Sequence, residues 1–277
     1  MQYDPRMRSY FDGEQQLDRA VAAATLSEKG VSTQVIEEVQ NALPHRALGV
    51  ILYGSQARGD VTEVSDIDLL VIAAAPGRAK AVGRVNRSTY DWIQFLSAAG
   101  TLFGMHLARD GVVLHDSGGI VDALSEIGEI DEDRLWDRLR SLASLLSLPE
   151  PEQHRNLPGF VRHARYVLRT ATYAAALHPG PPCFSVTELA ERFDDPSLAV
   201  LLSSHPTVQG PASPDVLSEL SRRIERKLGT IDPIPYETLT DAIVGLSESS
   251  PEVSDAGLLI LNRDSSDPYA IIPRVIL

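Results

Sequence analysis

Apolar residues recur at intervals of three and four along the first 45 residues, which is the spacing of one helix face. This spacing predicts two N-terminal helices that pack on the rest of the protein. The apolar positions of the first are Leu17, Ala20, Val21 and Ala24, and those of the second are Val35, Ile36, Val39 and Leu43.

The pattern then changes to short continuous apolar runs, which favour buried strands. The segments "ALGVILYG" (47–54) and "DIDLLVIAA" (66–74) are the strongest of these, and "GRVNRSTY" (83–90) and "VVLHD" (112–116) predict two more strands. Between them, "DWIQFLSAAGTLFGMHLARDG" (91–111) predicts one helix that ends at Gly111. Residues 46–118 are therefore expected to form a small α+β domain built on a mixed sheet.

From residue 119 the pattern is mainly helical, with amphipathic segments separated by clusters of proline and glycine such as "HPGPPC" and "HPTVQGPASP". This region, residues 119–277, predicts a mainly α-helical C-terminal domain. The last segment, "AGLLILNRDSSDPYAIIPRVIL", favours a terminal hairpin of two short strands around a Ser-Asp turn.

Composition narrows the classes of function. The 38 acidic and 25 basic residues give a net charge of -13, which disfavours broad binding to nucleic acid. A single cysteine, Cys183, permits neither an intramolecular disulfide nor a cysteine-based metal site. No apolar run reaches the roughly 18 residues that a membrane span needs, and the N-terminus lacks the apolar core of a signal peptide. We therefore expect a cytoplasmic protein without a membrane partner.

The two strongest predicted strands carry the candidate chemistry. Asp66 and Asp68 are two residues apart at the start of a strand, so both point to the same face of the sheet. Paired carboxylates favour a hard divalent cation such as Mg²⁺. Upstream, Gly54 allows a tight turn, Ser55 begins a short predicted helix, and Arg58 offers a guanidinium for phosphate oxygens.

The stretch "YGSQARGDVTEVSDIDLLVI" (53–72) resembles the active-site signature of the DNA polymerase β-like nucleotidyltransferase superfamily, and is most similar to its minimal and antibiotic nucleotidyltransferase branches. The resemblance covers roughly residues 46–116. It implies that Gly54 and Ser55 hold a nucleoside triphosphate and that Asp66 and Asp68 bind two Mg²⁺ ions. Arg58 and Ser65 fit the spelling of the branch as supporting residues.

The resemblance also implies a third carboxylate on a later strand, and there the sequence departs from the family. Asn86 falls near the expected position, and an amide is a poorer metal ligand than a carboxylate and is not a base. Asp91 is the candidate for the missing catalytic acid, although it could instead cap the following helix. Asp110 and Asp116 are further candidates, the first at a helix end and the second in an Asp-Ser-Gly-Gly turn.

His106 shares its predicted helix with apolar residues and is interpreted as a histidine at the edge of the core rather than a ligand. The predicted function is Mg²⁺-dependent transfer of a nucleoside monophosphate from a nucleoside triphosphate to a hydroxyl acceptor on a protein or RNA. Two alternatives remain open: transfer to a small molecule of the aminoglycoside type, and a non-catalytic module that binds nucleotide or a partner. A homodimer is a further open alternative for the assembly.

Overall fold

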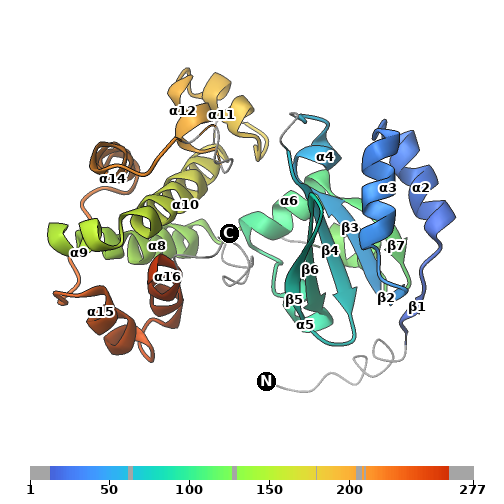
Figure 1. Ribbon diagram of the computed structural model, residues 1–277, viewed down its shortest axis with the longest axis horizontal. Helices are drawn as coiled ribbons and strands as arrows, with labels where there is room; N and C mark the ends of the chain where they lie inside the picture. Colours follow the sequence, from blue (N-terminus) through green and yellow to red (C-terminus); the bar gives the residue numbers. More distant parts are fainter. Residues whose placement is uncertain are drawn as a thin grey trace. The chain divides into compact units, whose positions relative to one another are not determined.

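A computed structural model describes residues 13–61, 65–126, 130–178, 180–203, 208 and 210–261, without the side chain of residue 78. The chain divides into two compact units, Met1–Glu129 and Ile130–Leu277. The division falls after residue 129, later than the boundary at residue 118 that the sequence pattern suggested. Each unit is described by itself below (Figure 1).

Both expected N-terminal helices are present in the first unit. Helix α2 spans Arg19–Glu28 and is capped by Asp18, whose carboxylate accepts the N–H groups of residues 20 and 21. Helix α3 spans Thr33–Ala42 and is capped by the Ser32 hydroxyl. Side-chain caps of this kind stabilise the first turn of a helix by satisfying N–H groups that have no partner inside it.

A five-stranded mixed sheet forms the centre of the first unit, in the order β5-β6-β4-β3-β7. Strands β4 and β6 are parallel, and the other neighbours are antiparallel. The four predicted strands are confirmed, but β5 was missed because its polar and small residues lack the β-branched pattern of a buried strand. The bounds are Gly49–Tyr53 (β3), Ile67–Ala73 (β4), Gly77–Val82 (β5), Val85–Asp91 (β6) and Val112–Asp116 (β7). Two-residue strands β1 (Gln15–Gln16) and β2 (Arg46–Ala47) pair separately.

The single helix predicted for residues 91–111 is wrong, because the structure divides it into α5 (Trp92–Leu96) and α6 (Leu102–Asp110). Gly100 has a φ of 72° in the turn between them, and the Thr101 hydroxyl caps α6. Apolar periodicity continues across this break, since both helices turn their apolar sides to the same core. Periodicity alone therefore did not show where one helix ends and the next begins.

Helices cover both faces of the sheet. On one face α2 and α3 pack through Leu26, Val35 and Val39 against inward side chains of the strands. On the other face α6 lies against β3, and the Tyr53 and Phe103 rings meet edge to face with centroids 5.7 Å apart. Figure 1 shows α2 and α3 on one side of the strands and α6 on the other. Short helices α4 (Ser55–Arg58) and α7 (Ile120–Ser125) complete the unit.

The second unit is helical in its described part, and the α+β class with a helical C-terminal part is confirmed. Helix α10 (Leu157–Ala175) lies at its centre and packs against α8, α14 and α16. A Cβ atom at Gly159 would lie 2.0 Å from the Ile260 carbonyl oxygen, so glycine lets the backbones of α10 and α16 approach closely. The other elements are α8 (Glu132–Ala143), η1 (Ser144–Ser147), α9 (Glu150–Arg155), α11 (Val186–Arg192), α12 (Ser197–Leu201), α14 (Pro214–Leu228), α15 (Leu239–Leu246) and α16 (Pro251–Leu261).

The terminal hairpin requires a correction. Residues 256–261, expected as its first strand, form the end of helix α16. Val253, Ala256 and Ile260 are buried, and their spacing of three and four is helical. The remainder of the expected hairpin lies outside the described residues. None of the described helices is long and apolar enough to cross a lipid bilayer.

Candidate active site

The Gly-Ser turn joins strand β3 to the short helix α4. Gly54 has φ 76° and ψ -156°, a backbone conformation that is essentially restricted to glycine. Ser55 begins α4 and is half-buried, and the helix ends at Gly59, which has a φ of 81°. Glycine at both ends thus lets the chain turn sharply after the strand, run through one turn of helix and leave again.

The turn lies directly against Asp68. In the antiparallel register of β3 and β4, Tyr53 is opposite Asp68, so the residue after Tyr53 lies beside the start of β4. A Cβ atom built on Gly54 would lie 2.7 Å from Asp68 Oδ2, closer than van der Waals contact permits. The two halves of the sequence motif, Gly-Ser and Asp-x-Asp, are therefore in contact in the fold.

Asp66 comes just before β4 and is exposed, whereas Asp68 lies within the strand and is half-buried. Ile67, between them, is fully buried on the opposite face. The alternation places both aspartates toward the face that carries α5 and α6. Ser65 precedes Asp66 and is half-buried, so four of the predicted site residues (Gly54, Ser65, Asp66 and Asp68) gather at this end of β3 and β4.

Asn86 is the neighbour of Asp68 on the adjacent strand. The parallel register of β4 and β6 pairs Asp68 with Asn86 and Ala73 with Asp91. Paired residues of neighbouring strands point to the same face, so an amide lies beside the Asp68 carboxylate.

The assignment of Asp91 as a catalytic residue is not supported by its position. Asp91 lies five positions after Asn86 along the strand, a distance of roughly 16 Å at the usual rise per residue. The Asp91 carboxylate instead accepts the Gln94 N–H at 2.7 Å, and the Gln94 side chain accepts the Asp91 N–H in return. Asp91 is the N-cap of α5, because a carboxylate at a helix start satisfies N–H groups that the helix leaves unpaired.

Asp116 is also distant from the motif. It lies opposite Gly49, at the other end of β3 from Tyr53. Its carboxylate accepts the N–H groups of residues 119, 120 and 121 at 2.8 to 3.0 Å. Burial opposes ionisation, but these donors outweigh it and hold the pKa of Asp116 below its ordinary value. Asp116 is thus a structural residue at the start of α7.

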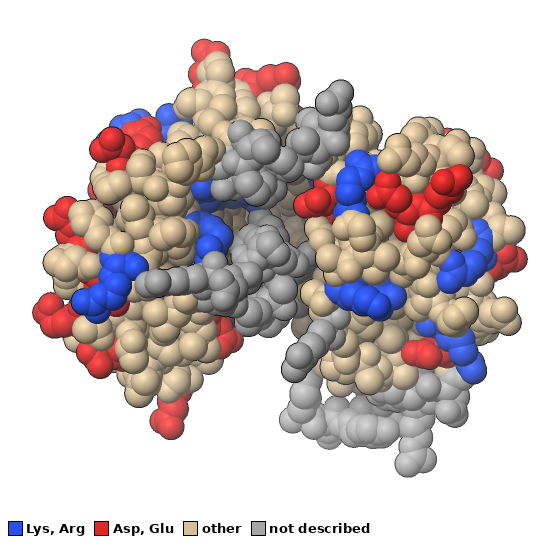
Figure 2. All heavy atoms as spheres, viewed as in Figure 1, with Lys and Arg blue, Asp and Glu red and all other residues tan. Residues whose placement is uncertain are grey.

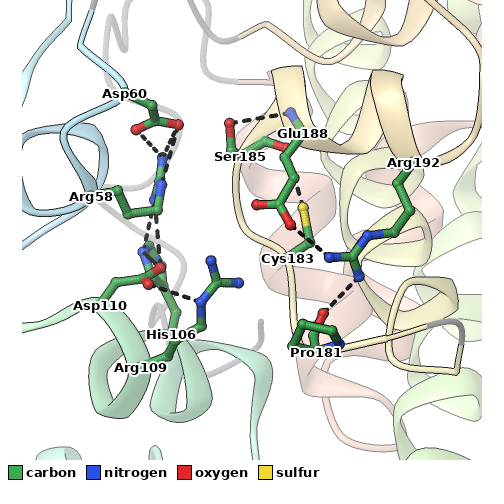
Figure 3. Close-up of polar contacts among 10 residues, drawn as sticks. All are labelled: Arg58, Asp60, His106, Arg109, Asp110, Pro181, Cys183, Ser185, Glu188 and Arg192. Atoms are coloured by element: carbon green, nitrogen blue, oxygen red, sulfur yellow. Dashed lines mark hydrogen bonds and ion pairs between the residues drawn. The ribbon is translucent and has the colours of Figure 1, made fainter.

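Arg58 lies at the centre of a polar cluster on the α6 side of the sheet (Figure 3). Its guanidinium bonds Asp60 through Nε and Nη2, both at 3.3 Å, and Nη1 lies 3.0 Å from His106 Nε2. Asp110 Oδ2 is 4.0 Å from Nη1, and Arg109 Nε is 3.0 Å from Asp110 Oδ1. The arginine predicted for phosphate binding is therefore held in place by residues of α6 and of the loop after α4.

His106 is neutral near physiological pH. Burial, together with the charges of Arg58 and Arg109, lowers the pKa of His106 to about 3. An arginine nitrogen can only donate, so His106 Nε2 accepts the bond from Arg58 and the proton of the ring is on Nδ1. The contact of Nε2 with Asp110 at 3.5 Å is consequently not an ion pair, because the ring carries no charge.

The roles of His106 and Asp60 were not apparent from the sequence. His106 and Asp110 are four residues apart on α6, which places them on one helix face, but nothing in the sequence indicated that this face contacts Arg58.

Within the described ranges no group of three or more His, Cys, Asp or Glu side chains forms a metal cluster. In the second unit Cys183 is buried, and burial raises the pKa of its thiol to about 11, so the thiol is protonated near neutral pH.

A match to a known domain family supports the interpretation of the first unit. Residues 32–103 match the nucleotidyltransferase domain family. Among solved structures, the chain is similar to a nucleotidyltransferase-like protein from Exiguobacterium sibiricum 255-15, with 18% sequence identity and a TM-score of 0.28, over 73% of this chain and 74% of that chain. No curated protein matches the chain. The family match includes the Gly-Ser turn, the Asp-x-Asp pair and Asn86.

Proposed function

We propose that this chain transfers a nucleoside monophosphate from a nucleoside triphosphate to a hydroxyl group, because residues 32–103 match the nucleotidyltransferase domain family. The reaction depends on Mg²⁺, and the acceptor is carried by a protein or an RNA. The triphosphate is the donor substrate, and pyrophosphate is the leaving group.

One observation carries the proposal: Gly54 lies directly against the Asp68 carboxylate. A Cβ atom built on Gly54 would be 2.7 Å from Asp68 Oδ2. A turn of this shape brings backbone N–H groups close to a bound phosphate, since no side chain stands between them. A triphosphate at the turn is then next to the carboxylate pair. This juxtaposition is the requirement of phosphoryl chemistry, where catalysis consists mainly of positioning and charge neutralisation.

The side chains present fit a hard divalent cation. Asp66 and Asp68 offer carboxylate oxygens, and Asn86, the register partner of Asp68, adds an amide oxygen. All three are the oxygen donors that Mg²⁺ prefers. A cation bound there supplies positive charge that neutralises the triphosphate oxygens.

The other residues have separate roles in the proposal. Arg58 directs its guanidinium to phosphate oxygens, and Ser55 donates from the first turn of α4. Asn86 cannot take a proton, so Asp66 and Asp68 are the carboxylates near the acceptor hydroxyl in the described part of this edge of the sheet. The first unit thus binds and orients the triphosphate, and residues outside the motif determine which acceptor is bound.

A small-molecule acceptor of the aminoglycoside type is the second candidate, favoured by the net charge of -13, which attracts polycations. On the described part of the face shown in Figure 2, acidic and basic side chains are interspersed in both units. Such a face has no continuous basic surface of the kind that binds the nucleic acid backbone. Among macromolecular acceptors, the net charge of -13 favours a protein over RNA, because it repels a polyanion.

The test is incubation of the protein with each α-³²P-labelled nucleoside triphosphate and Mg²⁺, with cell lysate, total tRNA and an aminoglycoside panel as separate acceptors. Asp66→Asn and Asp68→Asn are expected to abolish transfer without unfolding the protein, because each removes a carboxylate from a repulsive pair. Asp91→Asn is the matched control, since it makes the same chemical change at a helix cap and is expected to keep full transfer. Absence of labelled product with every acceptor, with triphosphate still bound, would favour a non-catalytic module instead.

A further inference from the structure

The contact between Arg58 and His106 extends the candidate site to helix α6. Arg58 belongs to α4, 48 positions before His106, and the two side chains meet at 3.0 Å between Nη1 and Nε2. We propose that His106 is a positioning residue that holds the Arg58 guanidinium beside the Gly54-Ser55 turn, in the orientation that contacts a triphosphate. The proposal rests on the proposed function, since it assumes that a triphosphate occupies the turn.

A neutral acceptor is suited to this task. A carboxylate in the same place would fix the guanidinium equally well but would also neutralise its charge, and phosphate binding would lose that attraction. The nearest buried carboxylate is that of Asp110, whose Oδ2 is farther from Nη1, at 4.0 Å. His106 therefore fixes the direction of Arg58 without adding a further negative charge to those of Asp60 and Asp110.

The surroundings of the imidazole keep it neutral. Burial disfavours its charged form, and so do the nearby cations Arg58 of α4 and Arg109 of α6. Asp110 of α6 contacts Nε2 at 3.5 Å, and the Tyr53 ring of β3 meets the imidazole edge to face with centroids 6.0 Å apart. Only 16% of the His106 side chain is exposed. The ring is confined between a strand and two helices and has little freedom to turn away from Arg58.

Asp60 holds the opposite edge of the guanidinium and differs from His106 in exposure. The Asp60 side chain is 35% exposed, whereas that of His106 is 16% exposed. The Asp60 carboxylate accepts from Nε and Nη2 of Arg58, the edge of the guanidinium that also suits two phosphate oxygens. A triphosphate would replace Asp60 on that edge while His106 continues to hold Nη1.

The experiment measures binding of Mg²⁺ tripolyphosphate and of the four Mg²⁺ nucleoside triphosphates by isothermal titration calorimetry. His106→Leu removes the acceptor and keeps an apolar body, so we expect affinity to fall about tenfold, the scale of one hydrogen bond to a charged group. His106→Gln places an amide oxygen near the position of Nε2 and should bind within about twofold of the original protein. A structural role alone would not produce this rescue.

A double-mutant cycle with Arg58→Ala separates positioning from direct contact. If His106 acts through Arg58, adding His106→Leu to Arg58→Ala produces no further loss of affinity. Losses that add, or unchanged affinity in His106→Leu, would overturn the inference while the function stands. If the original protein binds none of the five ligands, both proposals are wrong.

A second measurement uses the unmodified protein and therefore does not depend on the folding of a variant. Long-range ¹H–¹⁵N correlation of the imidazole resonances reports which ring nitrogen carries the proton. The inference requires a neutral His106 with its proton on Nδ1 and an unprotonated Nε2 at pH 7. A proton on Nε2 would contradict acceptance from Arg58 and overturn the proposal.

Discussion

Replacing Gly54 with alanine tests whether the turn against Asp68 is a requirement of the site or only of the fold. The backbone at Gly54 has φ 76° and ψ -156°, and an L-residue in this region is strained by about 1–3 kcal/mol. The new Cβ would also lie 2.7 Å from Asp68 Oδ2. Because that oxygen ends a side chain that can rotate, the collision displaces the carboxylate more than it destabilises the protein.

Gly59→Ala is the matched control. Gly59 has φ 81° and ψ 7°, so alanine there is strained by about 1–2 kcal/mol, but its Cβ would meet no atom within 4 Å. The two variants should therefore lose comparable stability while only Gly54→Ala moves Asp68. We expect transfer to fall about 100-fold in Gly54→Ala, the scale of a misplaced catalytic group, and to be retained in Gly59→Ala.

Stability is measured by urea denaturation in a Trp136→Phe background. The chain has two tryptophans, Trp92 in α5 and Trp136 in α8, so the remaining fluorescence reports unfolding of the first unit. Transfer is measured with the labelled nucleotide and the acceptor that the original protein modifies. Equal activity of Gly54→Ala and Gly59→Ala would refute the reasoning, because the contact with Asp68 would then have no consequence for the chemistry.

Three other changes probe the remaining features. Asn86→Asp places a third carboxylate beside Asp68 and should increase the affinity for Mn²⁺, measured by calorimetry, about tenfold. Unchanged affinity would show that residue 86 does not contribute to metal binding. Asp91→Ala should cost about 1 kcal/mol of unfolding free energy through the lost cap and leave transfer intact, and loss of transfer in folded protein would restore Asp91 as a catalytic candidate. Burial lowers the pKa of His163 to about 4, although its bond to the Leu142 carbonyl opposes the shift. Between pH 6.5 and 4 the unfolded chain binds a proton that the folded chain does not, so stability should fall by about 3 kcal/mol as pH decreases over this window. His163→Gln should lack that component when unfolding is followed across the same pH range, and an identical pH dependence would contradict the low pKa.

Most of the fold followed from local patterns. The helices α2 and α3 and the strands β3 and β4 were predicted because the spacing of apolar residues is a local property that extends over a few residues. The break between α5 and α6 and the strand β5 were missed. Apolar periodicity continues across the break at Gly100 and is lacking in β5, so this pattern alone identified neither.

The residues of the candidate site also differ in how far the sequence alone could predict them. The Gly-Ser turn and the Asp-x-Asp pair were predicted as site residues from their types and spacing in two neighbouring strands, and the structure brings Gly54 and Asp68 into contact. The sequence left Asp91 undecided between catalysis and capping. The parallel register of β4 and β6 favours capping, since it brings Asn86 beside Asp68 and carries Asp91 to the far end of the strand.

Local sequence suffices to predict a mixed α+β unit with a Gly-Ser turn and two aspartates, followed by a helical region, because these features depend on neighbours in the chain. Three contacts become visible only in the folded protein: Asp68 lies against Gly54, Asn86 pairs with Asp68, and His106 meets Arg58. These contacts join residues that are far apart in sequence. Their geometry depends on strand register and helix packing, which arise when the core closes and distant side chains are buried together.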